Sequence, residues 1–119
     1  MKAKCDKDSQ WATLEVRFDR VYQTLSNAVF QDVTNMSMIC GDAVNVVNNL
    51  LIANSIDTIF INHPEPPQQT GNHQNPESQG QHLLTKEFIE SIFKVLAPNG
   101  RLIIVTDNNW YVDMIFCFV

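Results

Sequence analysis

Short apolar runs recur along this chain and are separated by stretches with helical spacing. Residues 11–16 and 35–40 are apolar-rich, and residues 56–61 form a nearly continuous apolar run. A run like the one at 56–61 is typical of a strand buried on both faces, and the two shorter segments are also predicted to be β-strands. A fourth strand is predicted at residues 102–105, after the turn signal Pro98-Asn99-Gly100.

Helical periodicity fills the intervals between these strands. Apolar residues at three- and four-residue spacing predict an amphipathic helix over residues 18–30. Residues 43–53 are compatible with a helix, although three asparagines lower its propensity. Thr85 can cap a further helix, whose expected buried face consists of Phe88, Ile89, Ile92, Phe93 and Leu96. This alternation predicts an α/β fold with a mostly parallel sheet and right-handed crossovers.

Two segments lack such periodicity. Residues 1–10 are charged and are expected to be loose. Residues 63–81 are rich in Gln, Asn, Pro and Gly, and a loop of this length is usually functional or mobile. The 119 residues are enough for one small domain.

The start of that long loop carries a carboxylate between prolines. Pro64, Pro66 and Pro67 cannot donate to a strand ladder, so they end any strand at this point. Glu65 is held between two of them, at the carboxyl end of a predicted strand, where open α/β sheets bind ligands. A carboxylate on such a stiff loop suits the orientation of a substrate base.

Carboxylates lie at or just after the end of each predicted strand: Glu15, Asp42, Glu65 and Asp107. If the strands are parallel, all four lie along one edge of the sheet. Glu15 can bond the hydroxyls of a ribose or can be a plain surface residue. Asp42 can bond an adenine amino group, cap the following helix, or do both. Asp107 can contact substrate or serve as a turn residue.

The composition narrows the choice of partners. The formal net charge is −5, which provides no bulk attraction for nucleic acid, so any such binding needs a local basic patch or a partner. Three cysteines without CxxC spacing argue against a disulfide framework, and the spacing of His63, His73 and His82 matches no zinc site, so no metal is expected. Trp110 and Tyr111 can stack on a base, although aromatic residues beside an apolar run are more often core.

The location expected from the sequence is intracellular and soluble, in the nucleus or the cytoplasm. No apolar run is long enough to span a bilayer, so no membrane partner is expected. The first eight residues lack the apolar stretch of a signal peptide.

Several motifs together resemble the tRNA (guanine-N7-)-methyltransferase family, from about residue 14 to residue 111. Leu-Glu-Val-Arg at residues 14–17 is similar to the family's Leu-Glu-Ile-Arg segment, and residues 35–43 are similar to its Asn-to-Ala segment. Ile-Asn-His-Pro-Glu-Pro at residues 61–66 resembles its Phe-Pro-Asp-Pro motif. Leu-Ala-Pro-Asn-Gly at residues 96–100 and Thr106-Asp107 resemble its turn and its Thr-Asp strand end.

This resemblance implies an incomplete Rossmann-like class I methyltransferase fold that uses S-adenosyl-L-methionine (S-adenosylmethionine). No glycine-rich loop precedes Glu15, so the family's first strand is missing and residues 1–119 are expected to be a partial methyltransferase domain. The implied cofactor-binding residues are Glu15, Arg17, Asp42, Ala43 and Asn62. Glu65 is implied as the catalytic residue, and Gln69 and Asp107 are implied as substrate-binding residues.

The chain departs from the family at several positions. His63 replaces Phe and Glu65 replaces Asp in the proline motif, Gln69 stands where a lysine is usual, and Gln81-His82 stands where paired arginines are usual. The resemblance still implies tRNA as substrate, and the lost cations favour a non-catalytic protein subunit that supplies tRNA-binding surface. Methylation of another substrate and a non-catalytic remnant are the alternatives.

Overall fold

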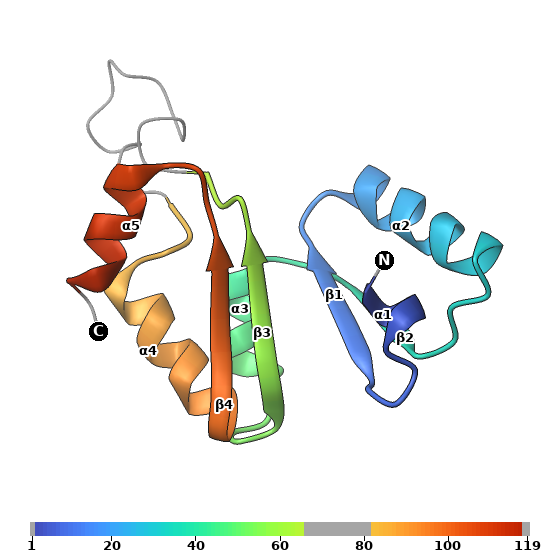
Figure 1. Cartoon of the computed structure of the whole chain (residues 1–119), viewed down its shortest axis with the longest axis horizontal. Helices are drawn as coiled ribbons and strands as arrows, with labels where there is room; N and C mark the ends of the chain where they lie inside the picture. Colours follow the sequence, from blue (N-terminus) through green and yellow to red (C-terminus); the bar gives the residue numbers. More distant parts are fainter. Residues whose placement is uncertain (1, 66–81, 118–119) are drawn as a thin grey trace. The chain divides into compact units, whose positions relative to one another are not determined.

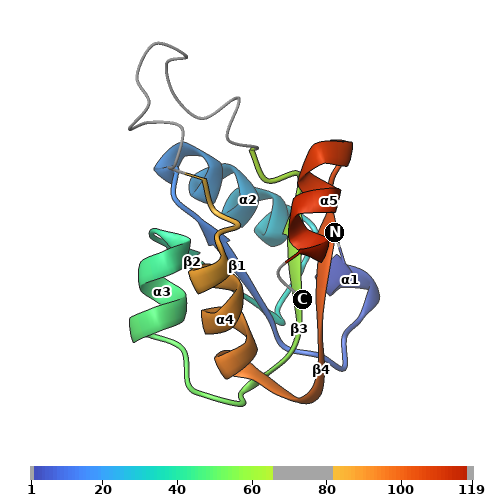
Figure 2. The same ribbon diagram turned by 90° about the vertical axis from the view of Figure 1, so that its left-hand side faces the viewer.

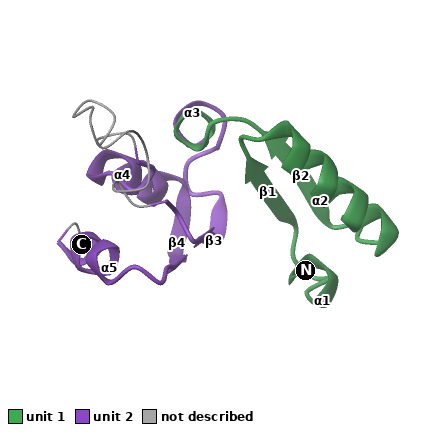
Figure 3. Ribbon diagram, turned by 90° about the horizontal axis from the view of Figure 1, so that it is seen from above, with its two compact units in different colours: residues 1–46 green, residues 47–119 purple. Residues whose placement is uncertain are grey.

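The structure is a computed structural model that describes residues 2–65 and 82–117. The chain divides into two compact units, Met1–Val46 and Val47–Val119, which are coloured separately in Figure 3. The boundary falls inside one helix, α3 (Ala43–Asn49). Each unit is built on one pair of parallel strands.

The first unit contains α1 (Lys2–Cys5), β1 (Trp11–Glu15), α2 (Phe18–Phe30) and β2 (Met36–Cys40). β1 and β2 pair in parallel, from Trp11 opposite Met36 to Glu15 opposite Cys40. The helix α2 connects the two strands and lies alongside them in Figure 1. The strands and the helix predicted from the sequence are therefore present, with ends that differ by at most one residue.

The start of the chain is held in place, although its charge favours a loose end. The Asn35 side-chain amide donates hydrogen bonds to the carbonyl oxygens of Ala3, Asp6 and Ser9, at 3.0, 2.8 and 2.9 Å. Asn35 is buried, and buried amides need such partners. Asn35, which precedes β2, therefore holds the segment before β1 through hydrogen bonds. The composition of residues 1–10 does not predict this contact.

The second unit contains β3 (Ile56–Asn62), α4 (Lys86–Val95), β4 (Leu96–Val105) and α5 (Asn109–Phe116). β3 and β4 are parallel neighbours, paired from Thr58 opposite Arg101 to Asn62 opposite Val105. Figure 2 shows the same strands from the side, with α5 near the end of β4. The helix α3 ends at Asn49, four residues before the predicted end, because its asparagines disfavour helix.

The predicted turn at residues 98–100 lies inside the bounds of β4. Asn99 has a left-handed φ of 64°, and the strand register shifts between Ile56 and Thr58, opposite this segment. A Cβ added at Gly100 would be 2.8 Å from the carbonyl oxygen of Ala97, so only glycine fits this close approach. The turn therefore forms as a bulge in the strand rather than before it.

The core of the second unit lies beneath α4. The hydroxyl of Thr85 accepts a hydrogen bond from the backbone N–H of Phe88 at 3.2 Å, which confirms the predicted cap. The helix buries four side chains, Phe88, Ile89, Ile92 and Val95. Phe93 was predicted on that face but is 52% exposed. The apolar arc of this helix is wider than the strands can cover, and Phe93 lies at its edge.

The apolar face predicted for α2 is largely open to solvent. Ala28 is the one buried residue of the helix, and Val21 is half-buried. Phe18 is 75% exposed, and Tyr22 and Val29 are also exposed. The helix thus faces the β1–β2 pair with its smaller side chains.

The strand pairing agrees with the predicted α/β class. β1 pairs with β2 in parallel, and β3 pairs with β4 in parallel, each pair connected through a helix. In the part of the chain that the structure describes, the strands form two separate pairs, and no helix there is long and apolar enough to cross a membrane.

Candidate functional site

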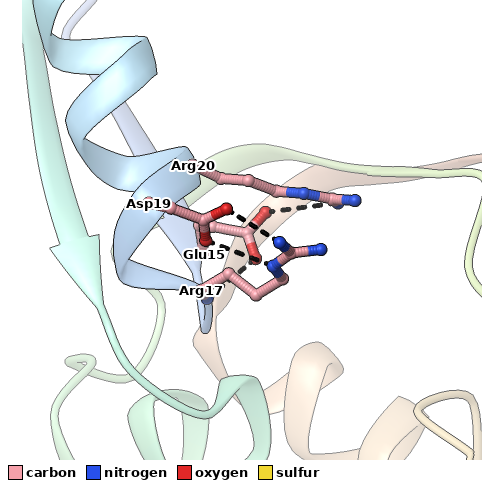
Figure 4. A network of polar contacts seen from close by, with 4 residues as sticks. All are labelled: Glu15, Arg17, Asp19 and Arg20. Carbon is pink, nitrogen blue, oxygen red and sulfur yellow. Dashed lines mark hydrogen bonds and ion pairs between the residues drawn. The ribbon is translucent and has the colours of Figure 1, made fainter.

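The end of β1 presents the Glu15 carboxylate in a fixed position. Glu15 is the last residue of β1, and its Oε1 accepts a hydrogen bond from the backbone N–H of Arg17 at 3.0 Å. Its Oε2 is 4.0 Å from Nη1 of Arg20. Figure 4 shows these side chains together with Asp19, at the start of α2. A carboxylate held this way keeps acceptor positions for a ligand hydroxyl.

The Arg17 side chain turns toward Asp19. Its Nε and Nη2 donate to the two carboxylate oxygens of Asp19, at 3.2 and 2.7 Å. This hydrogen-bonded pair raises the pKa of Arg17 and lowers the pKa of Asp19. The side chains of both residues are exposed. Arg17 therefore lies next to Glu15, as predicted for a cofactor-binding residue, but its guanidinium is bonded to Asp19.

The end of β2 lies against the end of β1. The backbone N–H of Gly41 donates to the carbonyl oxygen of Glu15 at 3.1 Å. Oδ2 of Asp42 accepts a hydrogen bond from the backbone N–H of Asn45 at 3.0 Å, and Ala43 is the first residue of α3. The capping interpretation of Asp42 is therefore confirmed. One oxygen serves the cap, which leaves acceptor capacity for an adenine amino group.

The end of β3 changes direction sharply at His63. Asn62 is the last residue of β3 and pairs with Val105. The backbone N–H of His63 donates to the carbonyl oxygen of Val105 at 2.7 Å, and His63 has a left-handed φ of 48°. Few residues other than glycine adopt this conformation. Glu65 follows two positions later and is exposed, so its backbone emerges from a defined turn.

The end of β4 is a second defined turn. The backbone N–H of Asn108 donates to the hydroxyl of Thr106 at 3.2 Å, and Oδ1 of Asn108 accepts from the backbone N–H of Tyr111 at 3.0 Å. Asp107 lies between Thr106 and Asn108, and its side chain is exposed. Because β3 and β4 are parallel neighbours, Asp107 and Glu65 follow their strands at the same end of the second unit.

The predicted site residues thus fall into two local groups. Glu15, Arg17, Asp42 and Ala43 lie at the strand ends of the first unit, and Asn62, Glu65 and Asp107 lie at those of the second. Gln69 lies outside the described residues. The meeting of all four strand-end carboxylates along one edge stays a prediction.

Trp110 and Tyr111 form an aromatic cluster near Asp107, and the sequence alone did not show which of them is buried in the core. Tyr111 is 0% exposed, and its hydroxyl lies 3.2 Å from Nδ1 of His82. Burial raises the pKa of Tyr111 and lowers the pKa of His82. Trp110 stacks on Tyr111 with ring centroids 6.2 Å apart, and 47% of it is exposed. The spacing of Tyr111 with Met114 and Ile115 marks the core face of α5.

The possible ligands of these groups follow from their chemistry. Carboxylates and strand-end backbone groups can hold the hydroxyls and amino groups of a nucleoside. Within residues 2–65 and 82–117, no three His, Cys, Asp or Glu side chains lie close enough together to hold a metal ion.

Comparison with known proteins identifies similar chains. A family model described as “Putative methyltransferase” matches residues 2–118. The tRNA (guanine-N(7)-)-methyltransferase of Chlamydia felis is 30% identical over 110 residues, which are 92% of this chain and 46% of that protein. The proteins of the same name from Chlamydia muridarum and Histophilus somni are 27% and 26% identical, each over 106 residues. These cover 89% of this chain in both cases, and 45% and 40% of the relatives. The chain spans slightly less than half the length of the curated relatives it matches.

Proposed function

Because the chain belongs to the methyltransferase family whose model it matches, we propose that it carries cofactor-binding and catalytic residues of a tRNA guanine-N7 methyltransferase. The observation that carries the proposal is the position of Glu65 and Asp107, which follow the neighbouring strands β3 and β4 at the same end. Two carboxylates at adjacent parallel strand ends suit the recognition of a purine edge rich in N–H donors.

The family implies S-adenosylmethionine as the methyl donor, and the residues of the first unit fit part of it. Glu15 would accept hydrogen bonds from the ribose hydroxyls, with Arg17 nearby. Asp42 and Ala43 would contact the adenine.

The chemistry requires alignment rather than proton removal. When bound, the cofactor supplies a methyl group attached to a positively charged sulfur. The N7 lone pair of guanine would accept this methyl group, and the electrons of the carbon–sulfur bond would stay on sulfur. The positive charge passes to the purine ring, and no proton moves. The protein must therefore hold N7 in line and favour the charged ring.

Glu65 and Asp107 would meet both needs. Their carboxylates would accept hydrogen bonds from N1–H and the 2-amino group of guanine. These bonds strengthen as the ring becomes cationic, so they favour the transition state over the bound substrate. The turn at His63 and the hydrogen-bonded turn around Asn108 hold the backbones of the two residues in place.

Binding of tRNA would require positively charged groups in addition to these carboxylates. The chain has 13 acidic and 8 basic residues, so its overall charge repels a polyanion. Gln69, proposed as a substrate-binding residue, is uncharged. A protein subunit that contributes basic surface would supply the missing attraction. Methylation of a substrate other than tRNA is the second candidate, and the same acidic charge favours it.

The test is a methylation assay on the intact protein that contains this chain. Labelled S-adenosylmethionine and unmodified tRNA are supplied, and 7-methylguanosine is measured by mass spectrometry. Glu65→Gln and Asp107→Asn keep the shape of each side chain but remove its charge. Each is expected to lower kcat by about 10- to 100-fold, the value of one charge-assisted hydrogen bond.

The matched control is Glu90→Gln, because Glu90 is an exposed carboxylate on α4. It is expected to leave the rate unchanged. Full activity in both Glu65→Gln and Asp107→Asn would contradict the proposed roles. Methylation of a different acceptor, with affinity that does not depend on salt, would favour the second candidate over tRNA.

A further inference from the structure

The turn after β4 carries a half-exposed aromatic side chain close to a proposed substrate residue. Trp110 is the second residue of α5, three positions after Asp107, and 47% of it is exposed. Its neighbour Tyr111 is completely buried. The helix thus begins with one aromatic side chain that belongs to the core and one that is left partly open to solvent, at the carboxyl end of β4.

The indole ring of Trp110 stacks on Tyr111, which is held in turn by its own contacts. It stacks nearly parallel to the Tyr111 ring, with an interplanar angle of 13°. The Tyr111 ring meets the His82 ring edge-on at 5.9 Å, and its hydroxyl lies 3.2 Å from Nδ1 of His82. The cap from Asn108 holds the backbone of the same turn. The ring therefore loses little conformational freedom when a flat ligand stacks on it.

Its location distinguishes this residue from a second aromatic side chain of similar exposure. Phe93 on α4 is 52% exposed. Since α4 ends at Val95 and β4 begins at Leu96, Phe93 lies near the start of β4, at the opposite end from Asp107 (Figure 1). Ligands of parallel sheets bind at the carboxyl ends of the strands. Trp110 meets this condition, and Phe93 does not.

We propose that Trp110 is a substrate-contacting residue whose exposed face stacks on the target purine while Asp107 accepts hydrogen bonds from the purine edge. This inference rests on the proposed function. An aromatic platform beneath a base strengthens binding by about 5- to 150-fold. The indole face also attracts cations, and tryptophan does so best among the aromatic side chains.

The attraction of the indole face for cations matters for this reaction. The purine is neutral before methyl transfer and cationic afterwards, so its attraction to the indole increases as the new bond forms. A stack of this kind favours the charged ring over the neutral one by about 2- to 30-fold. Trp110 thus stabilises the transition state in addition to positioning the base. The inference predicts that a 7-methylated guanine nucleotide binds more tightly than the unmethylated one.

An NMR titration measures the preference for the methylated nucleotide without catalysis. The intact ¹⁵N-labelled protein is titrated with guanosine 5′-monophosphate and with 7-methylguanosine 5′-monophosphate. The indole N–H signal of Trp110 is assigned by its loss in Trp110→Phe. We expect this signal to shift toward higher field with both nucleotides, and the Kd to be lower for the methylated one by about 2- to 30-fold. An indole signal that does not move with either nucleotide overturns the inference.

Variants separate a substrate contact from a purely structural role. Trp110→Phe keeps a ring and is expected to retain binding with a smaller preference for the methylated nucleotide. Trp110→Leu is expected to lose the preference and to lower kcat/KM by about 5- to 150-fold. Phe93→Leu is the matched control and should change neither. If Trp110 only shields Tyr111, Trp110→Leu lowers the Tm but leaves the ratio of the two Kd values intact, which contradicts the inference.

The two proposals fail in different ways. If the wild-type protein forms 7-methylguanosine in tRNA while Trp110→Leu folds and keeps its kcat/KM, the stacking inference is wrong and the proposed function stands. If the wild-type protein forms no 7-methylguanosine in any tRNA, the proposed function is wrong. If Trp110→Leu does not fold, the wild-type indole shift and the Trp110→Phe preference decide.

Discussion

The two units share a plan of two parallel strands with a helix between them in the sequence, yet the helices differ in what they bury. α4 buries four large or branched side chains, and Ile92 among them is 1% exposed. α2 is longer but buries only Ala28. α4 also begins with a side-chain cap from Thr85, whereas the N-cap residue of α2, Arg17, makes no such bond.

The two units therefore hold their strand-end residues by different means. In the second unit, the turns that carry Glu65 and Asp107 extend from strands and a helix with a packed apolar core. In the first unit, Glu15 and Asp42 are held by short polar contacts to backbone N–H groups. Substitutions in the core should therefore affect the second unit strongly, and substitutions of polar groups should affect the first unit locally.

The largest expected effect compares the two helices directly. Ile92→Ala should lower the free energy of unfolding by about 2–5 kcal/mol, because it leaves a cavity beneath α4. Leu25→Ala on α2 should cost less than about 1 kcal/mol, because Leu25 is exposed. Urea denaturation with hydrogen exchange measures both losses and assigns them to a unit. Equal losses would show that the apolar face of α2 is covered in solution.

The next effect concerns the cap at Asp42. Asp42→Ala should destabilise α3 by about 1 kcal/mol, whereas Asp42→Asn should cost only a few tenths, because asparagine caps helices about as well as aspartate. If Asp42 also holds the cofactor, Asp42→Asn should weaken S-adenosylmethionine binding by about 3- to 10-fold with little loss of stability. Calorimetry on the intact protein measures this affinity. Unchanged affinity would leave Asp42 as a cap alone.

A smaller effect is the pH dependence that His82 gives the second unit. Burial lowers the pKa of His82, so the unfolded chain binds this proton more readily than the folded chain. The stabilisation is complete above the ordinary pKa of about 6.5 and is lost as the pH falls through the lower folded value. The urea midpoint should therefore decrease between about pH 7 and pH 5. His82→Gln should reduce that decrease, and an identical decrease in this variant would contradict the assignment.

The smallest effect tests the polar contacts of the first unit. The hydrogen-bonded pair with Arg17 lowers the pKa of Asp19 below its usual 3.8. NMR titration of the Asp19 carboxyl carbon should give a value that rises toward 3.8 in Arg17→Gln. Added salt should have a similar but weaker effect, because both side chains are exposed and are screened. A value that is the same in both proteins would show that the pair does not persist in solution.

Much of the local structure could be predicted because it depends on neighbouring residues. The bounds of α2 follow from its spacing, and β3 ends one residue beyond the predicted end, before the prolines that stop it. The cap at Thr85 and the left-handed Asn99 also follow from short-range preferences. The carboxylates after each strand were found by the same reasoning, since strand ends can be recognised from a few residues.

Other features depend on contacts between distant residues. Asn35 holds residues Ala3, Asp6 and Ser9 through three hydrogen bonds that span 26 to 32 positions. His82 meets Tyr111 across 29 positions. No local pattern marks either partner, so neither contact could be predicted.

Local sequence patterns placed β1, α2, β2 and β3 to within one residue, and they gave the α/β class and the carboxylates at the strand ends. Which side of each helix is covered depends on contacts in three dimensions, as with Phe93 and the exposed face of α2. The same contacts decide that Tyr111 enters the core while Trp110 stays partly open. The reason is that hydrophobic spacing defines an apolar arc on a helix, whereas burial depends on which part of that arc meets another element.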